Sequence, residues 1–209
     1  MKRRTFLSNL ATCGLAMPIL RSYANETLKN DNQPVRIVWI TDVHHGYGTD
    51  AQQRLKKFMT FSDRVKPNFI LQGANFCHPT PEAASFIQVW NSFAGKKIHV
   101  LGNHDMNKGS KSAIMDLWQM QQPYYSFDAG AFHFVVLDCI FSLKDDRYVD
   151  CANANYYINA QYRDLVSPEQ IAWLEHDLKQ TSKPTIIISH QAFGEIWTGG
   201  TVPNRMLVR

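Results

Sequence analysis

The order of apolar and polar positions predicts strands that alternate with helices over the first part of the chain. Short apolar runs at residues 35–41, 68–72 and 96–102 have the length and composition of buried strands. Between them, residues 51–65 and 81–93 repeat apolar side chains at helical spacing. Because this alternation is typical of βαβ units, we expect a mostly parallel sheet in an α/β fold.

The pattern changes in the middle of the chain. Residues 124–128 and 132–138 are two strand-like runs separated by a turn at Ala129 and Gly130, which predicts an antiparallel hairpin and therefore a second or mixed sheet. Residues 141–166 are polar, rich in Asn and Tyr, and without a clear period. We expect a long loop there, of the kind that is usually functional or mobile.

The next predicted helix has a strong start signal. Ser167 can cap it, Pro168 suits its first turn, and Gln170 stands where a capping box needs a side chain that reaches back. Residues 169–178 then repeat apolar positions at helical spacing, and residues 184–189 read as a buried strand.

The N-terminal segment predicts export. Residues 1–24 combine basic side chains, an apolar run and small residues before a cleavage site after Ala24, which is the pattern of a signal peptide. The pair Arg3 and Arg4 resembles a twin-arginine export signal. Residues 25–34 are polar and are expected to form a linker, so the protein is expected in the periplasm or another extracytoplasmic compartment.

Two alternatives apply to this segment. Lipid attachment at Cys13 ranks second to cleavage, because the preceding Thr12 is unusual in a lipoprotein signal. Export by the general secretory route instead of the twin-arginine route also stays open. Neither alternative leaves a membrane-spanning segment after the signal is removed.

Composition favours one globular domain and gives little support for nucleic-acid binding. The chain has 209 residues, of which 44% are hydrophobic, enough for one sizeable core. Removing residues 1–24 takes away four of the 22 basic residues and none of the 18 acidic ones, so no basic patch for nucleic acid is expected. Cys77, Cys139 and Cys151 then remain, which predicts no disulfide framework, although one pair is possible. Cys139 is expected to be a small core residue.

Metal-type side chains follow the ends of four predicted strands. They are Asp42 and His44, then Asn75, then Asn103, His104 and Asp105, and finally His190. Strand ends of an α/β sheet converge on one crevice, where ligands usually bind. Asp42 and His44 are two residues apart, so in extended chain both point to one side and can hold one ion.

In this order, the segments "TDVHHG", "QGANFC", "LGNHD" and "ISHQ" resemble the calcineurin-like metallophosphoesterase family, from residue 35 to about residue 200. The resemblance implies a four-layer αββα sandwich, here incomplete at the C-terminus, over residues 35–209. It also implies a metal-dependent hydrolase of phosphate mono- or diesters with two metal ions, which would be Mn, Fe or Zn.

The resemblance assigns five metal ligands and two catalytic residues. Asp42 and His44 would bind the first ion, Asn103 and His190 the second, Asn75 would take the bridging position, and His104 would be the general acid, oriented by Asp105 or another carboxylate. Together, two such ions would polarise a phosphoryl oxygen and activate a bridging water.

The other histidines have less specific assignments. His45 and His78 border the expected site and are candidates for substrate binding. His78 stands three residues after the bridging position, where the Tyr-ligated purple acid phosphatases have a tyrosine, so that subgroup is not expected. His99 and His133 lie in predicted strands and His176 in a helix, and we interpret all three as structural.

Two departures from the family pattern weaken the expected metal centre. Asn75 stands where the family has a bridging Asp, and an alternative alignment that places Ala74 there restores no carboxylate either. Loss of this charge should lower metal affinity. The family also closes its site with a later Gly-His-x-His motif, yet no histidine follows His190.

We therefore expect a truncated domain of doubtful activity. A non-catalytic binding scaffold and an inactive remnant of a phosphoesterase are the alternatives. The sequence leaves the substrate, the metal and the oligomeric state open.

Overall fold

Three parallel strands form the first sheet of the computed structural model, which describes residues 33–158 and 163–193. The strands are β1 (Ile37–Ile40), β2 (Phe69–Gln72) and β3 (Lys96–His99), in the order β1-β2-β3. Ile37 pairs with Phe69, which in turn pairs with Lys96. The predicted parallel sheet is confirmed, although each strand is shorter than its apolar run.

The second sheet contains the predicted hairpin. β4 (Tyr125–Ala129) runs antiparallel to β5 (Phe132–Val136), and β8 (Thr185–Ile188) lies parallel to β5 on its other side. The strand order is therefore β4-β5-β8.

Four α-helices and three short 3₁₀ helices lie between the strands in the described part of the chain. The α-helices are α1 (Ala51–Val65), α2 (Ala84–Asn91), α3 (Lys111–Trp118) and α4 (Pro168–Leu178); the 3₁₀ helices are η1 (Pro81–Ala83), η2 (Asn103–Met106) and η3 (Asn155–Tyr157). The sequence analysis assigned no helix to α3. Its start signal is Ser110, whose side chain accepts a hydrogen bond from the amide of Ala113.

The predicted cap of α4 is half right. Ser167 accepts a hydrogen bond from the amide of Gln170, at 3.2 Å. The side chain of Gln170 does not complete a capping box. It bonds both backbone groups of Asp138, at 2.8 Å to the N–H and 2.7 Å to the carbonyl, and so ties α4 to the end of β5.

The long loop predicted at 141–166 is wrong in its first part. β6 (Phe141–Lys144) and β7 (Arg147–Asp150) form an antiparallel two-stranded sheet there. Both residues of the connecting turn have positive φ, 49° for Asp145 and 57° for Asp146. This is the backbone of a type I′ turn, which suits a two-residue hairpin and which Asp tolerates better than most residues.

Apolar side chains pack on both faces of the first sheet. Ile70 of β2 belongs to a cluster with α1, α2 and α3, which also contains Leu55, Met59, Trp90, Ile114 and Val38. Its neighbours Phe69 and Leu71 point the other way, into a second cluster with Phe134 and Val136 of the second sheet. The helices thus cover one face of this sheet and the second sheet covers the other.

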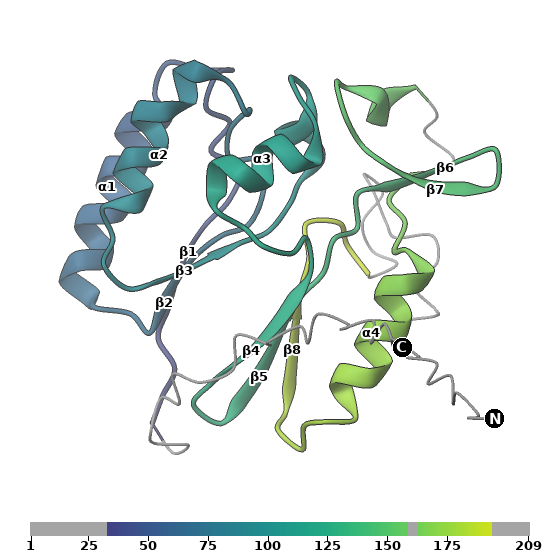
Figure 1. The fold of residues 1–209 in the computed structure, drawn as a ribbon. Helices are drawn as coiled ribbons and strands as arrows, with labels where there is room; N and C mark the ends of the chain where they lie inside the picture. Colours follow the sequence, from purple (N-terminus) through teal and green to yellow (C-terminus); the bar gives the residue numbers. More distant parts are fainter. Residues whose placement is uncertain (1–32, 159–162, 194–209) are drawn as a thin grey trace, which may run out of the picture.

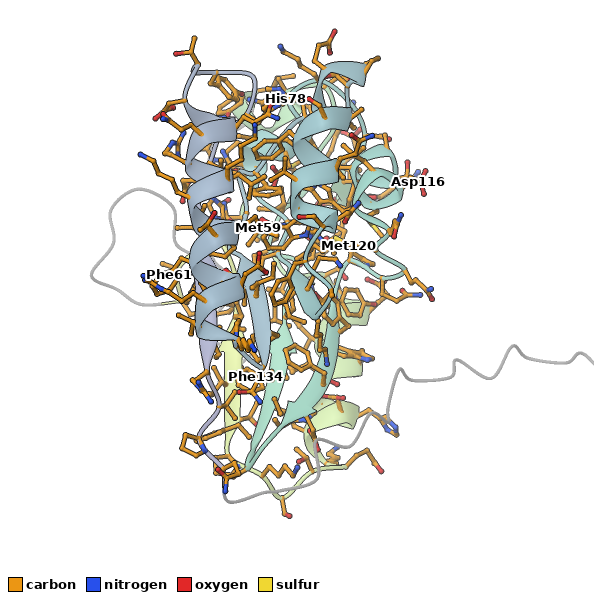
Figure 2. All side chains as sticks on the ribbon, turned by 90° about the vertical axis from the view of Figure 1, so that its left-hand side faces the viewer. Met59, Phe61, His78, Asp116, Met120 and Phe134 are labelled. Atoms are coloured by element: carbon orange, nitrogen blue, oxygen red, sulfur yellow. The ribbon has the colours of Figure 1, made fainter. Side chains whose placement is uncertain are left out.

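A third cluster joins the second sheet to α4 through Val135, Leu137 and Leu174. Figure 1 accordingly shows α1 and α2 on one side of the molecule and α4 on the opposite side. In Figure 2, Met59 points between the helices, whereas Phe61 points outward and is 45% exposed. The result is a mixed α/β fold.

Three further predictions concern the cysteines, membrane spans and the N-terminal segment. Within the described residues, Cys77, Cys139 and Cys151 are buried free thiols, so the possible pair does not form, and Cys139 lies in the core as predicted. None of the helices in the described ranges is long and apolar enough to cross a membrane. The export signal and nearly all of the linker lie outside the described residues and stay predictions.

Candidate functional site

The loops that follow β1 and β2 are joined through their backbones. The amide of Asp42 donates to the carbonyl of Ala74 at 3.1 Å, and the amide of His44 donates to the carbonyl of Asn75 at 2.9 Å. Asp42, His44 and Asn75 all have positive φ, at 51°, 53° and 50°. Left-handed backbone is uncommon for residues with a Cβ and often occurs at functional sites. These loops therefore hold the first predicted ligands in a fixed, strained geometry.

Asn75 lies at the centre of the site. Its Nδ2 is 3.1 Å from Oδ1 of Asp42 and 2.9 Å from Nε2 of His190, while its Oδ1 accepts a hydrogen bond from the amide of His104 at 2.9 Å. The backbone donor of His104 fixes which end of the amide is oxygen, because a flipped NH₂ group would face another N–H. The NH₂ group therefore points at Asp42 and His190.

His190 is oriented as a neutral acceptor. Its Nδ1 donates to the carbonyl of Gly73 at 3.1 Å, which leaves the lone pair of Nε2 directed at Asn75. Burial is the main reason that the pKa of His190 lies below its ordinary value. A backbone carbonyl that fixes the ring in this way is also typical of metal-binding histidines.

Asp42 is the carboxylate that accepts a hydrogen bond from the side chain of Asn75. Its Oδ1 lies 3.4 Å from Nε2 of His44, and its Oδ2 accepts a hydrogen bond from the hydroxyl of Thr41 at 2.7 Å. Burial acts to raise the pKa of Asp42, but the hydrogen bonds from Thr41 and Asn75 outweigh it and lower the pKa. Asp42 is therefore ionised at neutral pH.

Asp105 organises the backbone of the site. Its carboxylate is 1% exposed and accepts hydrogen bonds from four backbone amides, those of Asn75, Phe76, Cys77 and Gly102. Burial raises the pKa of Asp105, and the four N–H donors oppose that rise. Asp105 thus joins the loop after β2 to the loop after β3. The hydrogen bonds of Asp105 go to these backbone amides and not to the ring of His104, which it was predicted to orient.

Two tyrosines and an amide surround the ring of His104 instead. Nδ1 of His104 lies 3.2 Å from the hydroxyl of Tyr47, 3.0 Å from the hydroxyl of Tyr157 and 3.0 Å from Nδ2 of Asn107. Burial, with smaller contributions from two neighbouring histidines, lowers the pKa of His104. Neither tyrosine was predicted as a site residue, because nothing in their two separate loops indicates that both reach His104.

The remaining predicted site residues lie in different surroundings. Asn103 is 9% exposed, and its Nδ2 donates to the hydroxyl of Tyr157 at 3.3 Å. The ring of His45 stacks on Phe86 of α2, with 4.4 Å between centroids. His78 is 3% exposed, and burial lowers its pKa to about 4.

The other three histidines occupy the positions expected of structural residues. His99 is buried and accepts a hydrogen bond from the indole of Trp90 at 3.1 Å, while His133 bonds two carboxylates of the second sheet and α4. His176 is exposed on α4.

These donors do not fit a dinuclear metal centre. Within the described ranges, no group of three or more His, Cys, Asp or Glu side chains has a geometry that could hold a metal ion. Asp42 supplies the carboxylate that the side chain of Asn75 contacts, and this amide directs protons toward Asp42 and toward His190. Two cations at this position would repel each other with little compensating charge.

Comparison with known proteins identifies the fold. The model of the calcineurin-like phosphoesterase family matches residues 35–207. A dimetal phosphatase from Danio rerio has a similar structure, with a TM-score of 0.64 and 14% identity over 83% of this chain and 76% of that one. A phosphopantetheinyl hydrolase from Mycobacterium tuberculosis gives a TM-score of 0.49 and 14% identity over 76% of this chain and 68% of that one. No curated protein gives a match.

Proposed function

The chain belongs to the calcineurin-like phosphoesterase family, and we propose that it binds phosphate mono- or diesters at the ends of its parallel strands and hydrolyses them. Members of this family are metal-dependent phosphoesterases that typically bind two metal ions. The single observation that carries the proposal is the convergence of Asp42, Asn75, His104 and His190 from four separate strand ends.

The side chains of the site supply two parts of the reaction. His104 stands beside the centre and would donate a proton to the leaving oxygen of the ester. The amide of Asn107 donates to Nδ1 of His104, which places the N–H of the neutral ring at Nε2. Proton donation to the ester would come from the protonated ring, the imidazolium. Neutral His190 and the amide of Asn75 line the centre where the phosphoryl group would bind.

The donors present among the described residues do not make up the dinuclear metal centre that the family typically uses. We therefore expect slow hydrolysis compared with a family member that has a bridging carboxylate.

A second candidate function is binding of phosphate esters without hydrolysis. One observation favours it: Asn75 donates directly to Asp42 and to Nε2 of His190, at 3.1 and 2.9 Å. A site that is closed by its own hydrogen bonds needs no ion to hold its side chains together.

Two broader features belong to the same proposal. We propose that the complete architecture is the four-layer αββα sandwich of the family, which the three apolar clusters support. We also propose export to an extracytoplasmic compartment, on the basis of residues 1–24.

One experiment tests the proposal and separates the two candidates. The purified protein is reconstituted with Mn, Fe or Zn, the bound ions per chain are counted, and hydrolysis of p-nitrophenyl phosphate and bis-p-nitrophenyl phosphate is measured. If the protein is an enzyme, we expect turnover. His104→Ala should reduce this turnover, and His176→Ala, on the exposed surface of α4, should leave it unchanged. Phosphate binding without turnover would favour the second candidate. Absence of both turnover and phosphate binding would reject the two functions together.

A further inference from the structure

Two exposed tyrosine rings flank His104. Tyr47 is 54% exposed and Tyr157 is 46% exposed. Their ring centroids lie 5.6 Å and 5.8 Å from that of His104, and both hydroxyls are within hydrogen-bond distance of its Nδ1. Single exposed aromatic residues are common on protein surfaces, but a pair that flanks one candidate proton donor is a more specific arrangement.

Both tyrosines are held by ordered backbone. Tyr47 lies in a tight turn in which its amide donates to the carbonyl of His44 at 3.1 Å. Tyr157 ends η3, which is tied to the loops before α3 by two backbone bonds, from Asn153 to Gly109 at 2.9 Å and from Ala154 to Met106 at 3.3 Å. The two rings are therefore presented from different loops at fixed positions.

Two buried polar atoms of the same cluster have no hydrogen-bond partner within the described part of the chain. They are Nε2 of His78 and Oδ1 of Asn107. The ring of His78 lies 4.8 Å from that of Tyr47, and Asn107 contacts both His104 and Tyr47. Buried polar groups are normally paired, because an unpaired one costs free energy. The buried Nε2 of His78 thus keeps hydrogen-bonding capacity that no other described residue uses.

The position of the cluster follows from the proposed reaction. A general acid must contact the leaving oxygen, so the organic part of the ester must pass close to His104. Tyr47, Tyr157 and Asn107 contact Nδ1 of His104, and the hydroxyl of Tyr157 also lies 3.3 Å from Nε2, so Tyr157 stands beside both ring nitrogens. Aromatic side chains bind planar rings in stacked or edge-to-face geometry, and they gain less from a short aliphatic chain.

We infer that Tyr47 and Tyr157, with His78 and Asn107 beside them, form a subsite for a planar aromatic leaving group. This inference rests on the proposed function and specifies its substrate class as phosphate esters of aromatic or heteroaromatic alcohols. Tyr47 and Tyr157 are specificity-determining residues in this assignment.

Equilibrium binding of non-hydrolysable anions tests the inference. Inorganic phosphate, methylphosphonate and phenylphosphonate are titrated calorimetrically into the purified full chain in one metal-supplemented buffer. We expect phenylphosphonate to bind about tenfold more tightly than methylphosphonate. The double variant Tyr47→Leu/Tyr157→Leu should bring this ratio close to one with unchanged affinity for inorganic phosphate, and Tyr47→Phe/Tyr157→Phe should keep most of it.

The control is Tyr148→Leu in β7, which should leave the ratio unchanged. Phosphate binding with equal affinities for the two phosphonates, or a ratio that survives the double leucine variant, would overturn the subsite alone. Failure of all three anions to bind would reject the proposed function, and the subsite with it.

Discussion

Nδ2 of Asn75 lies 2.9 Å from Nε2 of His190, a residue 115 positions later in the chain. The same NH₂ group donates to Asp42, so one neutral amide connects the loops after β1, β2 and β8. A carboxylate at this position would bring negative charge to the centre, whereas the amide brings two protons. We therefore expect the residue at position 75 to determine how tightly the site binds metal ions.

Replacement of Asn75 by Asp is expected to raise the affinity for Mn²⁺ by more than tenfold. A charge pair about 4 Å apart is worth about 4 kcal/mol at an effective dielectric constant of about 20. Asn91→Asp, which adds the same charge on the exposed end of α2, is the matched control. Titration calorimetry measures the affinity. Addition of Mn²⁺ should raise the midpoint temperature of thermal unfolding in Asn75→Asp but not in Asn91→Asp. Equal Mn²⁺ affinities in wild type and Asn75→Asp would contradict the assignment of position 75 to the bridge.

Replacement of His104 by Ala is expected to slow hydrolysis most for esters with poor leaving groups. A positioned general acid contributes about 10²- to 10⁴-fold, and less when the leaving group needs no proton. The measurement compares kcat for phenyl phosphate and p-nitrophenyl phosphate, with His176→Ala as control. If both substrates lose the same factor, His104 is not the proton donor.

Asp105→Asn is expected to lower the free energy of unfolding by about 2–4 kcal/mol, because the amide cannot accept hydrogen bonds from all four backbone N–H groups. Asp145→Asn, in the type I′ turn, should change it by less than about 0.5 kcal/mol, since Asn also tolerates positive φ. Urea unfolding gives both values. A stability loss no larger in Asp105→Asn than in the control would show that Asp105 does not hold the two loops together.

A buried ion network fixes the hairpin of β6 and β7 to the core. Nζ of Lys111, on α3, lies 2.6 Å from Oδ2 of fully buried Asp138 and also bonds Asp150 of β7. Lys111→Met should destabilise the protein by about 3–5 kcal/mol, because it leaves the charge of Asp138 buried without a partner. Lys144→Met on the exposed hairpin is the control.

The double variant Lys111→Met/Asp138→Asn should recover part of this loss, because it removes the unpaired charge as well. Chemical unfolding of Lys111→Met, of Asp138→Asn and of the double variant tests the network. Strict additivity of the two single effects would contradict it.

The stability of the second sheet should depend on pH through His133. Its Nδ1 lies 2.7 Å from Asp128 and its Nε2 lies 2.8 Å from Asp177, while Lys183 also pairs with Asp128 at 3.1 Å. Burial acts to lower the pKa of His133, but the hydrogen bonds to Asp177 and Asp128 outweigh it and raise the pKa above 6.5. The folded state therefore holds this proton more tightly than the unfolded state.

The resulting stabilisation is complete below about pH 6.5 and is lost as the pH rises through the folded-state pKa. His133→Gln should flatten the decline in the free energy of unfolding above about pH 6.5, and His176→Gln should leave it unchanged. Urea titrations across this range provide the test. A decline that persists undiminished in His133→Gln would assign the pH dependence to other groups.

The candidate site could be predicted in part. Asp42, His44, Asn75, His104 and His190 were identified because polar side chains after buried strands stand out in a sequence, and the structure groups them around Asn75. Tyr47 and Tyr157 were missed, since nothing in two polar loops 110 residues apart indicates that both reach the same imidazole.

By itself, the sequence determined the alternation of strands and helices from β1 to β3, the parallel first sheet and the hairpin of the second, but it did not reveal α3 or the hairpin of β6 and β7. Hydrophobic periodicity and turn residues act over a few positions, so they can be read locally. The tertiary structure alone decided that Gln170 bonds Asp138 and not its own helix start, and that Asn75 donates to His190. Such partners depend on how whole layers pack, because the free energy of a buried polar group is set by the atoms that surround it in space.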